Sequence, residues 1–183
     1  MSTTGVEVAI VHNGQILLTK REDFEVWCLP GGAIDAGETV AQTAVREARE
    51  ETGIEVRLTR LVGIYSRPHW NYGGDHDILF AAEPVGGALE PQAGEVLAAG
   101  YFSPHKFPDP LVKWHRQRIF DALNGREGLV SRQQNAIWPF DQGMSRQRLY
   151  ELRDQSGLSR QAFYLKYFDQ YEPDGEALEI EKK

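Results

Sequence analysis

The stretch GAIDAGETVAQTAVREAREETGI, residues 32 to 54, decides how the rest of the chain is interpreted. It begins as a short loop and continues into a segment with helical spacing that ends at Gly53. An α-helix turns about 100° per residue, so Glu47, Glu50 and Glu51 fall on one face, within an arc of roughly 100°. Carboxylates this close together repel one another unless a cation binds among them. The stretch therefore indicates a site for a divalent metal ion.

A neighbouring side of the same segment is apolar. Four small or β-branched residues form this stripe: Ala41, Ala44, Val45 and Ala48. Small side chains allow a helix to lie close against a sheet. We expect a helix from Thr39 to Gly53, where the glycine can adopt a left-handed C-terminal cap. An acidic run is also typical of a solvated helix face, but the glycine, glutamate and arginine residues at fixed positions around it favour the metal site.

The order of these residues resembles the signature of the Nudix hydrolases. Gly32 is followed after five residues by Glu38, and after seven more by the sequence Arg46-Glu47-Ala48. Glu50-Glu51 and Gly53-Ile54 complete the pattern, so every fixed position is filled. Ala48 is smaller than the aliphatic residue that the family prefers. Leu-Pro-Gly-Gly before the signature and Tyr-Phe-Ser-Pro after it extend the resemblance over residues 8 to 125.

The resemblance implies a Nudix-type α/β/α sandwich around a mixed β-sheet, and we assign the Nudix domain to residues 1–130. The remaining residues, 131–183, are expected to form a helical C-terminal extension. Hydrophobic periodicity independently predicts an α/β chain. Strands are expected at residues 6–11, 16–20, 26–30, 54–65, 77–82 and 96–102. A further helix is expected to begin at Asp109-Pro110, with a capping aspartate and a first-turn proline, and to end at Gly125.

The extension is expected to form a helical hairpin followed by a polar tail. Helices are predicted at residues 145–156 and 160–171, on either side of a Gly-Leu-Ser turn, and residues 172–183 are expected to be frayed. The arrangement resembles a helix-turn-helix. However, residues 131–170 contain six Lys or Arg and four Asp or Glu, and the second helix is rich in aromatic residues. Packing on the core or against a partner copy is therefore favoured over DNA binding.

Composition limits the possible functions. The chain has 183 residues, a net charge of −7 and one cysteine, Cys28. The negative charge argues against broad nucleic-acid binding, but not against a phosphorylated substrate, because bound cations invert the local field. No apolar run approaches the roughly 18 residues of a membrane span, and no signal peptide is recognisable. A lone cysteine among apolar neighbours is expected to be a buried structural thiol, and a cytoplasmic location is expected.

The resemblance implies hydrolysis of a pyrophosphate linkage with Mg²⁺, for which Mn²⁺ could substitute. It assigns the metal to the carboxylates of Glu47, Glu50 and Glu51 and to the backbone carbonyl of Gly31. Magnesium prefers hard oxygen ligands and keeps several waters, so a few carboxylates are sufficient to bind it. We found no Ser-His-Asp arrangement with a recognisable context, which argues against a covalent intermediate.

Three further residues receive roles from the resemblance. Arg46 is expected to orient Glu47 and to pair with Glu38, which would cap or orient the loop. Glu95 precedes a late strand, where many family members carry an acid that binds metal or activates water. An exposed arginine and a plain loop glutamate are the alternative interpretations of Arg46 and Glu95.

Substrate marks lie in the segment RPHWNYGGDHD, residues 67–77. Pro68 is fifteen residues beyond the glycine that ends the signature, as in ADP-ribose pyrophosphatases, and together with Arg67 it favours that subgroup. Tyr72 occupies the position that marks dinucleoside polyphosphate hydrolases. Trp70 and Tyr72 could stack on a base or ribose, although loop aromatics also simply pack.

The preferred function is thus Mg²⁺-dependent cleavage of a nucleoside diphosphate derivative, with ADP-ribose favoured. One alternative is a nucleotide-sensing regulator in which the extension binds DNA. Another is a dinucleoside polyphosphate or RNA 5′-end pyrophosphohydrolase. The expected partner is a small nucleotide, with no membrane, no nucleic acid and a possible homodimer.

Overall fold

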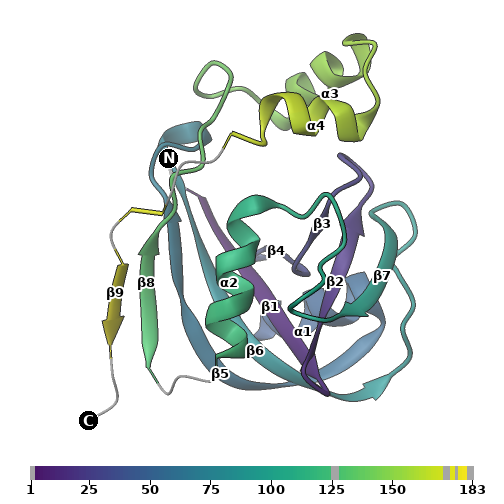
Figure 1. Cartoon of the computed structure of the whole chain (residues 1–183), viewed down its shortest axis with the longest axis vertical. Helices are drawn as coiled ribbons and strands as arrows, with labels where there is room; N and C mark the ends of the chain where they lie inside the picture. Colours follow the sequence, from purple (N-terminus) through teal and green to yellow (C-terminus); the bar gives the residue numbers. More distant parts are fainter. Residues whose placement is uncertain (1–2, 125–127, 171–173, 176, 181–183) are drawn as a thin grey trace.

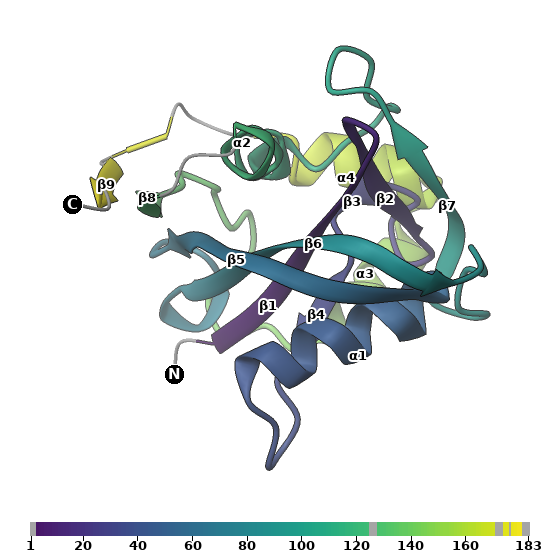
Figure 2. The same ribbon diagram turned by 90° about the horizontal axis from the view of Figure 1, so that it is seen from below.

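The fold is a mixed β-sheet with helices on both faces (Figures 1 and 2). The structure, a computed structural model, describes residues 3–124, 128–170, 174–175 and 177–180. Its strands are β1 (Thr3–His12), β2 (Gln15–Arg21), β3 (Trp27–Cys28), β4 (Gly31–Ala33), β5 (Ile54–Arg67), β6 (Asp75–Gly87), β7 (Val96–Phe102), β8 (Leu129–Gln133) and β9 (Ala177–Ile180). Its helices are α1 (Val40–Thr52), the 3₁₀ turn η1 (Asn71–Gly73), α2 (Lys113–Leu123), α3 (Arg146–Gln155) and α4 (Arg160–Tyr167).

The sheet order is β3-β2-β1-β6-β5-β8-β9, with β4 added to β1 and β7 added to β2. The pairs β1–β6 and β5–β8 are parallel and the other strand pairs are antiparallel. Helix α1 covers one face, and α2 and α4 lie on the other side in Figure 2. The expected α/β/α arrangement around a mixed sheet is confirmed.

Helix α1 has the ends that its sequence predicts. The Thr39 hydroxyl accepts a hydrogen bond from the Gln42 backbone amide, and the Thr39 backbone amide donates one to Gln42 Oε1. Gly53 closes the helix in the left-handed region with φ of 73°. The apolar stripe is only partly as expected, because Ala44 and Ala48 are buried whereas Ala41 and Val45 are exposed. Thr43 and Thr52 complete the buried side instead.

The predicted start of the second long helix is wrong. Helix α2 begins at Lys113, without a side-chain cap, and the Asp109–Pro110 peptide is cis. The preceding segment is held in extended pairing, since the Trp27 amide donates to the Pro110 carbonyl and the Val112 amide donates to the Trp27 carbonyl, both at 2.9 Å. These contacts with β3 are remote in sequence, so local capping signals could not reveal them. Gly125, the predicted helix end, lies outside the described residues.

Two strands were missed at the carboxyl end. Strand β8 pairs with β5 and crosses the expected boundary between residues 130 and 131, so the division into two parts stays a prediction. Strand β9 pairs with β8, although its four residues fall in the tail that was expected to be frayed. The predicted helix to Tyr171 ends at Tyr167, and Tyr171 itself lies outside the described residues.

The helices of the extension, α3 and α4, pack on the core. Phe24 of the core contacts the rings of Phe163 and Phe168, with centroid distances of 6.3 and 5.5 Å. The Arg153 guanidinium donates to the Asp23 carbonyl oxygen at 2.6 Å. The aromatic face of α4 therefore packs against the core of the same chain. None of the helices in the described part of the chain is long and apolar enough to cross a membrane.

Candidate active site

A cavity of about 760 Å³ lies where the core meets the extension. One part of its lining is polar and comes from the signature region and the loop before β7: Gly31, Gly32, Glu47, Glu51 and Glu95. Another part is aromatic and comes from both the core and the extension: Phe24, Trp70, Trp114, Trp138, Tyr150, Tyr164 and Phe168. Cavities of this size commonly hold small molecules and cofactors.

Glu51 is the most buried carboxylate of the helix α1 acidic face. Its Oε2 accepts a hydrogen bond of 3.2 Å from the Gly31 amide, which ties α1 to β4. Burial, helped by the nearby charges of Glu47 and Glu95, raises the pKa of Glu51 to about 7, although the hydrogen bond from the Gly31 amide acts in the opposite direction. A carboxylate that is costly to ionise alone is stabilised by a bound cation.

The Glu47 side chain is 13% exposed and lies beside β4. Burial raises the pKa of Glu47, and the hydrogen bond from Arg46 opposes this rise. Gly32 makes room for the side chain, because a Cβ at that position would lie 2.4 Å from Glu47 Oε1. Glycine is therefore favoured at this position of the signature because the Glu47 carboxylate lies close to the strand.

Arg46 joins the loop to the acidic face. Its guanidinium donates to both oxygens of Glu38, at 2.8 and 3.0 Å, and Nη1 donates to Glu47 Oε1 at 2.8 Å and Glu50 Oε2 at 2.9 Å. Glu38 also accepts from the Thr43 hydroxyl at 2.8 Å. The bonds from Arg46 and Thr43 lower the pKa of Glu38 to about 2, so it is ionised at neutral pH. Glu38 thus contacts the arginine and lies outside the cavity lining.

The proposed metal ligands are not all in the cavity. Glu47, Glu51 and Gly31 line it, and the exposed Glu95 joins them, whereas Glu50 is 49% exposed and turned to Arg46. No group of three acidic, histidine or cysteine side chains in the described ranges is close enough to hold a metal ion in this arrangement. The chemical type of the donors still suits a hard divalent cation such as magnesium, because three carboxylates line one cavity and oxygen ligands are the ones that such cations prefer.

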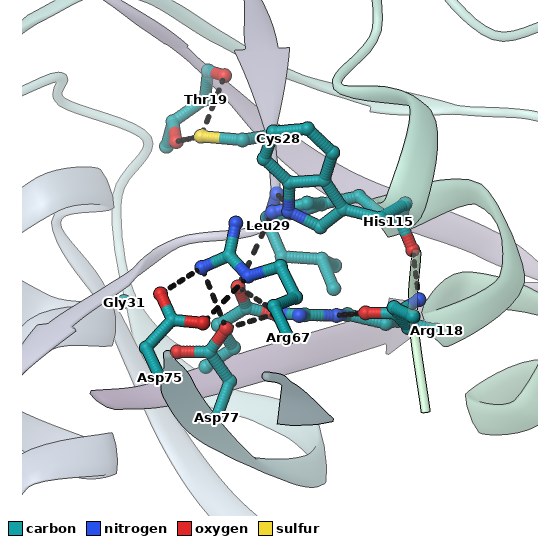
Figure 3. Close-up of polar contacts among 12 residues, drawn as sticks. Thr19, Cys28, Leu29, Gly31, Arg67, Asp75, Asp77, His115 and Arg118 are labelled. Atoms are coloured by element: carbon teal, nitrogen blue, oxygen red, sulfur yellow. Dashed lines mark hydrogen bonds and ion pairs between the residues drawn. The ribbon is translucent and has the colours of Figure 1, made fainter. Parts of the chain in front are cut away.

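The predicted substrate-binding residues divide into two pairs. Arg67 and Trp70 line the cavity, and Pro68 and Tyr72 do not. Arg67 is buried and donates to both oxygens of Asp75, at 2.8 and 2.5 Å, and to Asp77 at 3.2 Å (Figure 3). Its charge is thus balanced inside the protein. The role of Pro68 and Tyr72 in substrate binding stays a prediction.

Sequence reasoning missed a buried polar group in the cavity wall. The Leu29 amide donates to His115 Nδ1 at 3.1 Å, so His115 Nε2 carries the proton and faces Glu7 Oε1 at 3.2 Å. Burial lowers the pKa of His115 well below its usual value, which keeps the ring neutral. Arg118 Nη1 donates to the same oxygen of Glu7 at 2.6 Å. The sequence did contain one sign of this buried group, which is a glutamate, Glu7, within the apolar run Val6–Val11.

Cys28 is buried, as expected for a structural thiol. Its Sγ lies 3.6 Å from the Thr19 hydroxyl, and burial raises the pKa of the Cys28 thiol to about 12. A thiol that stays protonated at neutral pH is a poor nucleophile. The cavity therefore offers carboxylates rather than a thiolate for chemistry.

Comparison with known proteins identifies the family. A family model described as the NUDIX domain matches residues 1–122, more than half of the chain. The chain is a Nudix hydrolase. A Bacillus subtilis relative named "Putative 8-oxo-dGTP diphosphatase" is 36% identical over 128 residues, which cover 69% of this chain and 84% of the relative. An ADP-ribose pyrophosphatase of Methanocaldococcus jannaschii is 32% identical, over 67% of this chain and 74% of the relative.

Solved structures agree with this Nudix hydrolase in fold. An ADP-ribose pyrophosphatase from Streptococcus suis is 28% identical, with a TM-score of 0.59 over 68% of this chain and 91% of that one. A MutT protein from Bacillus halodurans has a TM-score of 0.61 at 23% identity, over 78% of this chain and 95% of that one. The family match ends at residue 122, so α3 and α4 lie beyond it.

Proposed function

We propose that this Nudix pyrophosphohydrolase cleaves the diphosphate linkage of a nucleoside diphosphate derivative with the help of Mg²⁺. The observation that carries the proposal is one cavity that contains both a group of carboxylates, Glu47, Glu51 and Glu95, and an aromatic wall. The carboxylates suit a metal-bound diphosphate, and the aromatic rings suit a planar group attached to it. A cytoplasmic location, expected from the sequence, is part of the proposal.

In this proposal Glu47 and Glu51, with Glu50 and the Gly31 carbonyl, hold the metal. Bound Mg²⁺ would neutralise phosphate oxygens, orient the substrate and lower the pKa of a water. Glu95 supplies an exposed carboxylate at the cavity, suited to accept a proton from the attacking water or to bind metal. Arg46 holds Glu47 and Glu50 in position and does not line the cavity itself.

ADP-ribose is the favoured substrate. The Methanocaldococcus relative is named for this activity, and Pro68 matches the mark of that subgroup. An oxidised nucleoside triphosphate is the second candidate, because the name of the Bacillus subtilis relative refers to 8-oxo-dGTP. The homodimer and the DNA-binding alternative stay predictions, and the inward packing of the aromatic face of α4 supports the enzyme over the regulator.

A substrate panel tests the function. The phosphorylated products of cleavage would be measured for ADP-ribose, 8-oxo-dGTP, dinucleoside polyphosphates, NADH and nucleotide sugars. Each substrate would be assayed first in chelator and then with Mg²⁺ or Mn²⁺. We expect turnover only with metal and the highest kcat/KM with ADP-ribose. Equal turnover in chelator would contradict the metal role, and ADP-ribose in last place would contradict the use of Pro68.

Replacing Arg46 by lysine should reduce turnover by about 10- to 100-fold, the usual range for residues that orient metal ligands. Lysine cannot bridge Glu38, Glu47 and Glu50 at once, because it lacks the planar fork of donors. The measurement is kcat with a titration of Mg²⁺, which should show weaker activation. Arg49→Lys is the matched control, since Arg49 is exposed on the same helix and should leave both values unchanged. Equal activation curves for the two variants would refute the positioning role.

A further inference from the structure

The extension supplies a substantial part of the aromatic wall. Trp138 lies 5.1 Å from Trp70 of the core and 5.8 Å from Phe168, and Phe168 lies 5.8 Å from Trp70 (all between ring centroids). All three line the cavity. Trp138 and Phe168 lie beyond residue 122, where the family match ends. The wall therefore depends on a segment that the matched domain does not contain.

A planar group suits this wall better than a cation does. Clusters of aromatic rings often bind cations, but here the position is already taken by Arg67, whose guanidinium lies 5.0 Å from the Trp70 ring and 4.7 Å from the Trp114 ring. Asp75 and Asp77 pair with that guanidinium (Figure 3). The remaining aromatic surface is thus left for a neutral, flat ligand such as a nucleobase.

Two buried oxygens of the lining have unused hydrogen-bonding capacity. Glu7 Oε2 and the Tyr164 hydroxyl have no hydrogen-bond partner among the described residues, although both atoms are buried and each residue as a whole is less than 10% exposed. Both residues line the cavity. Burial of a polar group without a partner is unfavourable, so a ligand that supplies partners would bind favourably.

Glu7 is also held in a fixed orientation. Its other oxygen, Oε1, accepts from Arg118 Nη1 and faces His115 Nε2. Burial raises the pKa of Tyr164, which keeps its hydroxyl protonated and able to donate or accept. One fixed carboxyl oxygen and one hydroxyl beside an aromatic wall match the donors and acceptors on the edge of a nucleobase.

We propose that residues 136–168 and the core together form a nucleobase subsite, in which Trp138, Trp70 and Phe168 contact the face of the base and Glu7 Oε2 and the Tyr164 hydroxyl bond its edge. This inference rests on the proposed function, which places the diphosphate beside Glu47 and Glu51. It further identifies the nucleobase as a group that the enzyme recognises, and it gives the extension a role in substrate specificity.

The decisive variant is Tyr164→Phe, because it removes an oxygen that has no protein partner and so should not weaken the fold. Leu165→Ala is the matched control, since Leu165 is exposed on the same helix and does not line the cavity. Trp138→Ala tests the wall, and Glu7→Gln exchanges the free acceptor for a donor. Thermal unfolding of each variant shows whether a loss of binding reflects a loss of fold.

Binding would be measured with adenosine and guanosine in chelator, by quenching of tryptophan fluorescence, so that neither metal nor hydrolysis is needed. Ribose 5-phosphate is the comparison ligand. We expect a nucleoside to bind and ribose 5-phosphate not to bind, and we expect Tyr164→Phe and Trp138→Ala each to weaken binding about tenfold. In turnover of a nucleoside diphosphate substrate, the same variants should raise KM about tenfold and preserve kcat.

The outcomes separate the two proposals. Nucleoside binding that depends on Tyr164 and Trp138, without hydrolysis of any diphosphate, would refute the proposed function and support the subsite. Metal-dependent hydrolysis with unchanged KM in Tyr164→Phe and Trp138→Ala would refute the subsite and leave the function. Binding of ribose 5-phosphate as tight as that of the nucleosides would also overturn the subsite.

Discussion

Replacing Glu51 by glutamine should lower kcat by about two to four orders of magnitude and leave the protein folded. The variant keeps the shape of the side chain and an oxygen for the Gly31 amide, but it removes a negative charge from the cavity. That charge is unfavourable without a cation, since burial raises the pKa of Glu51 to about 7. The metal-free variant should therefore be at least as stable as the native protein.

Thermal unfolding with and without Mg²⁺ gives a readout that does not depend on turnover. A ligand that binds only the folded state raises the unfolding temperature. We expect Mg²⁺ to stabilise the native protein and to have a smaller effect on Glu51→Gln. The matched control is Glu55→Gln, because Glu55 is an exposed carboxylate of β5 that does not line the cavity. Near-native kcat and an unchanged response to Mg²⁺ in Glu51→Gln would remove this residue from the site.

Local signals predicted helix α1 well. Its cap, its glycine end and its acidic face all depend on residues within one helix and its adjoining turns. The pairing of Arg46 with Glu38 was implied by the family resemblance and not by helical spacing. The exposure of Val45 was not predictable in this way. Which residues of an amphipathic helix are buried depends on how the helix is rotated against the sheet, and Thr43 and Thr52 occupy that side.

The aromatic wall could not be predicted, because it is formed by distant segments. Glu7 in β1, Trp70 after β5 and Tyr164 in α4 meet at one cavity. The aromatic content of α4 indicated packing on the core or against a partner copy, but it could not indicate which residues the helix contacts. The division between Arg67 and Trp70 in the cavity and Pro68 and Tyr72 outside it likewise depends on the path of the loop after β5, where Tyr72 has a φ of 59°.

Replacing Gly31 by alanine should lower the free energy of unfolding by about 3 kcal/mol or more. A Cβ at this position would lie 2.2 Å from the Val6 carbonyl oxygen and 2.8 Å from Glu7 Cα. Both are backbone atoms of β1, which pairs with β4 and with β6, so they cannot move aside without disturbing the sheet. Urea unfolding measures the loss, and kcat should fall as well because the Gly31 amide holds Glu51.

Gly37→Ala is the control, in the loop that follows β4. Gly37 has a φ of 90°, and a Cβ there would meet nothing within 4 Å. Its substitution should lower the free energy of unfolding only by the cost of a left-handed backbone conformation for alanine, about 1–2 kcal/mol. The metal site should be unaffected. If Gly31→Ala and Gly37→Ala destabilise equally, backbone conformation rather than close approach to β1 explains the glycine at position 31.

Gly32→Ala then separates an effect on the stability of the fold from an effect on the active site. Here the added Cβ meets the tip of a side chain, Glu47 Oε1 at 2.4 Å, and a side chain can rotate away at lower cost than a strand can. We therefore expect a smaller loss of stability than in Gly31→Ala, with a loss of kcat that is disproportionately large because Glu47 leaves the cavity. If stability falls as far as in Gly31→Ala and kcat is preserved in the folded fraction, Gly32 is required for strand β4 and Glu47 is dispensable for turnover.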